Sequence, residues 1–175
     1  MDKLDIVTDE SGNKVVLLPE IIFSNKQNIN WDNVEDYLGK YVGELIEIAE
    51  TRDIIYIGNK FPDEYGGSSY TRKTKGARAK AKANAAQGIR KMVEIATDKV
   101  YRENHKEKHS EDAHNGWFYY VTRFAIPLYN NEKKTGEYNA YSACLVVNHA
   151  ANGKMYLYDV VDIKKEASNP LKTIK

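Results

Sequence analysis

Three strand-like runs fill the C-terminal half of the chain, and their connections constrain the fold more than any other feature. The runs are rich in Tyr, Val, Ile and Phe, residues typical of strands. They read "GWFYYVTRFAIPLY" (116–129), "EYNAYSACLVVNHA" (137–150) and "KMYLYDVVDI" (154–163). A polar turn joins the first run to the second, and Asn152-Gly153, the strongest short hairpin signal, joins the second to the third. These connections predict an antiparallel meander.

Helical patterns and one further strand are predicted before the meander. Apolar residues recur at three- and four-residue steps after Asn30 and predict a helix that runs to about Glu50. The segment "DIIYIG" reads as a short buried strand, and the alanine-rich segment that ends near Gly88 favours a second helix. We therefore expect an α+β fold, with N-terminal helices packed on a C-terminal antiparallel meander sheet of about four strands.

Length and composition predict a single domain in a reducing compartment. We expect an N-terminal extension with short strands (1–29), one α+β domain (30–167) and a short tail (168–175). The single cysteine, Cys144, excludes an intramolecular disulfide framework. Neither a signal-peptide pattern nor an apolar run of about 18 residues occurs in the sequence, so we expect a cytoplasmic protein without membrane contact.

Charge is strongly segregated along a chain whose net charge is only +1. Residues 1–64 carry 14 acidic and 6 basic residues, a net charge of −8, whereas residues 65–93 carry 8 basic residues and no acidic ones. A solvated alanine-rich helix would explain the basic segment, and so would a surface that faces an anion such as phosphate. A third explanation is internal, with acidic side chains of residues 32–64 covering the basic helix.

The hairpin turn sets which side chains share a face of the predicted sheet. If Asn152-Gly153 forms a two-residue turn, His149 lies opposite Tyr156, and Leu145 and Val147 point to the same face. Cys144, Val146 and Leu157 would then point to the other face, beneath the helices. The open face would gather Arg123, Tyr119, His149, Tyr156 and Tyr158.

That set of side chains suits RNA. Aromatic rings stack on unpaired bases, arginine pairs with phosphate, and histidine transfers protons near neutral pH. A metal-independent ribonuclease needs a base, an acid and a cation at one phosphate. His109 is a further proton-transfer candidate. The spacing in "HKEKH" (105–109) does not match a zinc-protease motif, so no metal or cofactor is expected. Tyrosine-rich strands are also ordinary sheet material, and this alternative stays open.

Three long motifs carry a resemblance to a known family. They are "FPDEYGGSSYTRKTKGARAKAKANAAQGI", "IATDKVYRENHKEKHSEDAHNGWFYYVTRFAIP" and "YNAYSACLVVNHAANGKMYLYDVVDIKKE". The chain resembles the large polyvalent protein-associated domains of phages and conjugative elements, which are grouped with the Barnase–EndoU–colicin–RelE-like nuclease modules. The resemblance covers about residues 30–167 and implies a four-stranded antiparallel sheet and toxin-type ribonuclease activity. Relatives often have arginine at the position of Asn148, which leaves catalytic activity in this chain open.

Residues and resemblance together give two main hypotheses. The first is a metal-independent endoribonuclease of a mobile element, acting on tRNA or mRNA in the host cytoplasm. The second is a non-catalytic accessory module of a phage polyvalent protein that binds nucleic acid or a host protein. The predicted site residues are His109 and His149 as acid and base, Arg123 for the transition state, Tyr156 for stacking, and Lys75, Arg78 and Lys82 for phosphate.

Overall fold

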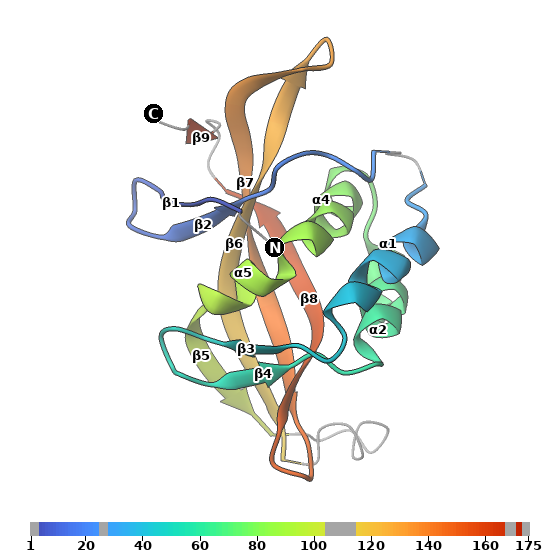
Figure 1. Ribbon diagram of the computed structural model, residues 1–175, viewed down its shortest axis with the longest axis vertical. Helices are drawn as coiled ribbons and strands as arrows, with labels where there is room; N and C mark the ends of the chain where they lie inside the picture. Colours follow the sequence, from blue (N-terminus) through green and yellow to red (C-terminus); the bar gives the residue numbers. More distant parts are fainter. Residues whose placement is uncertain (1–3, 25–27, 104–114, 167–170, 173–175) are drawn as a thin grey trace.

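The computed structural model describes residues 4–24, 28–103, 115–166 and 171–172. Nine strands of these residues form one sheet, and short helices pack on one of its faces (Figure 1). The strands are β1 (Ile6–Thr8), β2 (Lys14–Leu17), β3 (Leu45–Glu47), β4 (Ile54–Tyr56), β5 (Thr97–Arg102), β6 (Trp117–Asn130), β7 (Lys133–His149), β8 (Met155–Lys165) and β9 (Leu171–Lys172). The helices are α1 (Trp31–Leu38), α2 (Phe61–Gly67), α3 (Ser69–Lys73), α4 (Ala77–Ala85) and α5 (Ile89–Glu94), with 3-10 turns η1 (Gly39–Tyr41) and η2 (Ala86–Gly88).

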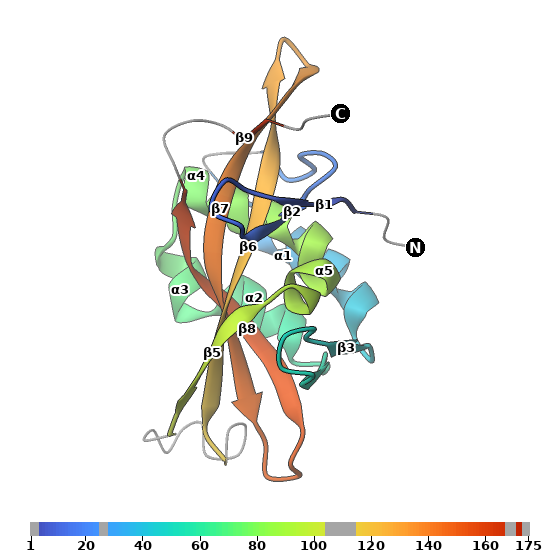
Figure 2. The same cartoon turned by 90° about the vertical axis from the view of Figure 1, so that its left-hand side faces the viewer.

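The long β6–β7 hairpin forms the centre of the sheet, and its tip extends beyond the helices (Figures 1 and 2). The strand order is β1-β2-β6-β7-β8-β4-β3, with β5 also paired to β6 and β9 to β7. The β2–β6 and β4–β8 pairs are parallel, and the other pairs are antiparallel. The sheet therefore combines the C-terminal meander with short strands from the N-terminal half.

The expected four-stranded meander beneath N-terminal helices is wrong. The three predicted C-terminal strands are present as β6, β7 and β8, but the sheet is larger and curls into a half-barrel. Its additional strands are mostly two to four residues long, and such short segments leave almost no alternating pattern in the sequence. Their pairing depends on edges that the long strands offer only after folding.

The described helices bury one face of the sheet, and none of them covers the other face (Figure 2). Small side chains allow α4 to approach the strands closely, and Ala79, Ala81, Ala83 and Ala85 are all buried. Ala81, Ala83 and Ala85 share the main core with the sheet residues Tyr120, Phe124, Leu145, Leu157 and Val160. The alanine-rich segment is therefore a core helix, so the interpretation as a solvated helix fails for most of α4.

The register of the β7–β8 hairpin differs from the predicted register by one residue. The amide of Ala150 donates to the carbonyl of Lys154 at 2.9 Å, which closes a loop longer than two residues. His149 consequently pairs with Met155 instead of Tyr156. A slip of one residue exchanges the two faces of a strand.

The exchange of faces is visible in the burial of β7. Leu145 and Val147 are fully buried in the main core, whereas Val146 lies in a separate small cluster with Trp117 on the opposite face. The predicted assignment of the β7 side chains to open and covered faces is therefore inverted. For β6 the predicted alternation is confirmed, because Tyr120 and Phe124 are in the main core.

The helical segments also differ from those predicted. The helix after Asn30 ends at Leu38 instead of Glu50, since Gly43 adopts a φ of +94° and the chain then forms β3. An additional helix, α2, forms in the segment "FPDEYGG", in which Pro62 occupies a position in the first turn that needs no N–H donor. No helix in the described part of the chain is both long and apolar enough to span a membrane.

Candidate functional site

His149 and Arg123, two of the predicted catalytic residues, do not converge. His149 lies on the helix-covered face, where its ring is 5.6 Å from that of Phe118. Arg123 points to the opposite face by strand alternation and pairs through Nε with Oε1 of Glu166 at 2.6 Å. His109 lies outside the described residues. The geometry therefore gives no single phosphate-sized space that His149 and Arg123 both reach.

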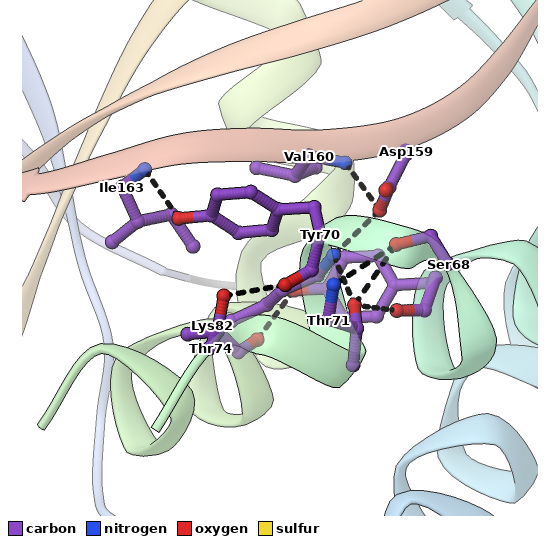
Figure 3. A network of polar contacts seen from close by, with 9 residues as sticks. Ser68, Tyr70, Thr71, Thr74, Lys82, Asp159, Val160 and Ile163 are labelled. Atoms are coloured by element: carbon purple, nitrogen blue, oxygen red, sulfur yellow. Dashed lines mark hydrogen bonds and ion pairs between the residues drawn. The ribbon is translucent and has the colours of Figure 1, made fainter. Parts of the chain in front are cut away.

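Lys82 is not on the surface that phosphate binding would require. Its side chain is fully buried, and Nζ donates to Oδ1 of Asp159 at 2.6 Å and to Oγ1 of Thr71 at 2.6 Å (Figure 3). The ammonium group also lies over the rings of Tyr65, at 4.6 Å, and Tyr70, at 5.1 Å. Lys82 thus separates from Lys75 and Arg78, with which it was predicted to act.

Asp159 reaches Lys82 because β8 contains an irregularity at this point. The register shifts between Val146 and Val147 of β7, which lie opposite Asp159 and Leu157 of β8 respectively. Burial raises the pKa of Asp159, against the lowering effect of Lys82, and burial lowers the pKa of Lys82. The carboxylate also accepts from the amide of Val160 at 2.8 Å. The two charges hold α4 to β8 within the core.

Lys75 and Arg78 lie together at the turn between α3 and α4. With Lys73, Tyr70 and Thr74 they line a pocket of about 480 Å³, which we call the cationic pocket. All three cationic side chains are exposed, and no acidic residue of the described chain lines this pocket. The hydroxyl of Tyr70 accepts from the amide of Ile163 at 2.9 Å, which fixes one wall against β8 (Figure 3).

The turn itself depends on Gly76. Its φ of +64° and ψ of −134° belong to a region that residues with a Cβ rarely adopt. The sharp change of direction separates α3 from α4 and places the cations on either side of it. The first turn of α4 lacks a side-chain cap, so its free N–H groups add positive potential beside the pocket.

Tyr156, the predicted stacking residue, lines a different cavity. This pocket has a volume of about 270 Å³ and lies where β4 separates from β8, beside the loop that leads into α2. We call it the tyrosine pocket, after Tyr156 and Tyr158 in its lining. It is also lined by Gly58, Asn59, Lys60, Phe61, Glu64, Asn148, Ala150 and Leu157.

Two residues of these arrangements were not among the predicted site residues. Asp159 interrupts the apolar run "YLYDVV", and a lone acid in a buried strand is a signal for an internal ion pair. Asn148 was noted only as a departure from an arginine. No pattern in the sequence alone shows that it lines a cavity, because its placement depends on the register of the hairpin.

No group of side chains suited to hold a metal ion occurs among the described residues. The sequence matches no model of a protein family, and neither a curated protein nor a solved structure matches it. Function must therefore be argued from the two pockets and their chemistry.

Proposed function

We propose that the chain is a non-catalytic RNA-binding module that holds the phosphate backbone of a single strand in the cationic pocket. The observation that carries this proposal is the convergence of Lys73, Lys75 and Arg78 on one pocket whose described lining has no acidic residue. This is the accessory-module alternative that the resemblance allowed. The ribonuclease alternative lacks geometric support, since His149 and Arg123 lie on opposite faces of the sheet.

Six other described cations are neutralised by ion pairs within the chain. The pairs are Arg52–Glu47, Lys82–Asp159, Arg90–Glu44, Lys91–Glu94, Lys99–Asp53 and Arg123–Glu166. None of them includes a cation of the cationic pocket. Lys82, which was expected beneath acidic side chains of residues 32–64, instead pairs with Asp159 of β8. The three exposed cations of the cationic pocket can pair with an external anion.

Single-stranded RNA fits the pocket better than a duplex does. Three cations around one turn can follow a short stretch of flexible backbone, and Tyr70 offers an aromatic wall beside them. Neutralising about three phosphates on a single strand predicts a slope of about −2 for the logarithm of the binding constant against the logarithm of salt concentration. A value near zero would exclude the phosphate backbone as the ligand.

The test compares two double variants that lose the same charge. Lys75→Ala/Arg78→Ala removes two cations of the pocket, whereas Lys14→Ala/Lys133→Ala removes two exposed cations elsewhere. We expect the first to weaken binding of a labelled single-stranded RNA and reduce the salt slope by about 1.4. We expect the second to leave both values nearly unchanged. Equal losses in the two variants would overturn the proposal, because binding would then follow net charge.

The same assay separates the alternatives. Binding of poly-glutamate as tight as that of RNA, with the same dependence on Lys75 and Arg78, would favour an acidic protein partner and contradict the RNA proposal. A ribonuclease would cleave RNA at discrete positions in EDTA. If Lys75→Ala/Arg78→Ala retained such cleavage and His149→Ala abolished it, the ribonuclease hypothesis would be restored.

A further inference from the structure

Asn148 lines the tyrosine pocket and carries a polar atom whose hydrogen-bonding capacity is unused. Asn148 is 7% exposed, and its Oδ1 has no hydrogen-bond partner among the described residues. Buried polar side-chain atoms are paired in the large majority of cases, so an orphan on a residue beside a cavity indicates a missing donor that a small turn of the side chain could reach. Among the described residues it is the sole buried side-chain nitrogen or oxygen without a partner.

The walls of the pocket favour a flat ring. The ring of Tyr156 lies 5.6 Å from that of Tyr56 and is held close to the backbone at Gly58, where an added Cβ would be 3.3 Å from Cδ2 of Tyr156. Tyr158 packs edge-on against Trp117 at 5.0 Å, which limits its freedom to rotate. Aromatic walls held in this way provide stacking surface at low entropic cost.

Size and charge restrict the ligand further. A volume of about 270 Å³ is just below the range of about 300–1,000 Å³ typical of sites for drug-sized ligands. It therefore suits one ring system rather than two nucleotides. Lys60 and Glu64 contribute opposite charges to the lining, so the pocket does not select a phosphate over a neutral ring. The atom to be satisfied is an acceptor, which calls for an N–H donor on the ring.

We propose that the tyrosine pocket binds one unpaired nucleobase that carries an exocyclic amine, with adenine as the best fit. The amine would donate to Oδ1 of Asn148, and the amide nitrogen of the same side chain can donate to a ring nitrogen, a two-point pattern suited to adenine. Tyr156 would contact the face or edge of the base. The base comes either from a free nucleotide or from an unpaired position in RNA, and the inference does not rest on the cationic pocket.

The test exploits two ligands that differ mainly at the exocyclic group. AMP carries an exocyclic amine, whereas purine riboside 5′-monophosphate carries only a hydrogen at that position and has no ring N–H, so the latter cannot donate to Oδ1 of Asn148. Isothermal titration of the full chain should show AMP binding roughly tenfold or more tightly than purine riboside 5′-monophosphate, because the wrong ligand leaves a buried acceptor unpaired. A uridine-rich single strand with one adenine, compared with the same strand with one unsubstituted purine, forms the second arm.

A matched variant isolates the hydrogen bond from the shape of the pocket. Asn148→Leu keeps the side-chain size and removes the acceptor, so the preference for adenine over unsubstituted purine should fall to within about twofold. The unliganded variant should also be no less stable to urea than the parent chain, because an unsatisfied buried atom is lost. Lys75→Ala/Arg78→Ala should retain the base preference, which separates this inference from the proposed function.

Each outcome decides the proposal. A preference with AMP assigns the site to free nucleotides, and a preference seen only in the RNA strand assigns it to an unpaired base; both support base binding. Equal affinity for the two bases in both arms, or no heat in either, would overturn it and leave a water molecule as the partner of Asn148. A preference that persists in Asn148→Leu would also overturn the assignment of this residue.

Discussion

Lys82→Met should strongly destabilise the fold, by an amount that depends on pH. The substitution keeps most of the aliphatic length of Lys82 but removes the cation 2.6 Å from Asp159, whose side chain is only 4% exposed. An isolated carboxylate at such a site is expected to bind a proton instead of remaining charged. The loss of unfolding free energy in the variant then equals the free energy needed to protonate Asp159 at the pH of the measurement.

The magnitude follows from the ordinary pKa of aspartate, about 3.9. Protonating a carboxyl group at pH 7 costs about 1.4 kcal/mol for each of about three pH units, or roughly 4 kcal/mol. That agrees with the roughly 3–5 kcal/mol typical of breaking a buried pair. At pH 5 the same cost is only about 1.5 kcal/mol. In the variant the pKa of Asp159 in the folded state is further raised. The variant is therefore most stable below about pH 3.9 and loses stability as pH rises.

Urea denaturation followed by far-ultraviolet circular dichroism at pH 7 and pH 5 measures both values. Lys75→Met is the control, because its side chain is exposed and its loss should change the free energy of unfolding by less than about 0.5 kcal/mol. Lys82→Met/Asp159→Leu should recover most of the stability and lose the pH dependence, since neither buried charge remains. A loss below about 1 kcal/mol at pH 7, or an equal loss at both pH values, would refute the reasoning.

Three further predictions concern packing, acid stability and thiol reactivity. Gly88→Ala should lower the free energy of unfolding by about 1–3 kcal/mol in urea, because the new Cβ would lie 2.9 Å from Cδ2 of Leu18; an unchanged midpoint would contradict the packing. Burial raises the pKa of Asp53, but hydrogen bonds, above all from Lys99, outweigh this effect, so the pKa is lowered overall. The parent chain should therefore lose stability as pH falls below about 3.9. The variant Asp53→Asn should lose less stability in a parallel acid titration. Burial raises the pKa of Cys144 to about 11, so alkylation at pH 8 should be on the order of a hundredfold slower than in urea, and equal rates would contradict this.

The sequence predicted what depends on local pattern. The long runs of aromatic and β-branched residues form β6, β7 and β8, and the helix start at Asn30 is confirmed by its side chain, which accepts from the amide of Asn33. Gly88 was predicted to end or kink the alanine-rich helix, and η2 ends there. These features are set by residues a few positions apart, so one sequence suffices to find them.

The pairing of strands distant in the chain was missed. The strand predicted in "DIIYIG" is present as β4, and β1 and β2 lie in the extension expected to hold short strands. The parallel pairs β2–β6 and β4–β8, however, join segments about a hundred residues apart, and short segments carry no signal for such pairing. The face of each β7 side chain depends on a single residue in the following loop. The Asn152-Gly153 turn was correctly predicted to reverse the chain, but its length was misjudged, and that error moved His149 to the wrong face.

The acid-free basic segment has two explanations because it spans two environments. An acidic residue next to Lys82 on the same helix would be buried near Asp159 without a cation of its own. A second negative charge destabilises the fold far more when it is buried than when it lies at the surface. Around Lys75 and Arg78 the side chains are exposed, and an acidic neighbour would only weaken a surface ready for phosphate. Substituting Glu for Ala83, which is fully buried, should therefore disrupt folding, whereas Glu for Ala77, which is exposed, should spare the fold and weaken RNA binding. If Ala77→Glu left RNA affinity unchanged, the absence of acidic residues near Lys75 and Arg78 would have no role in RNA binding.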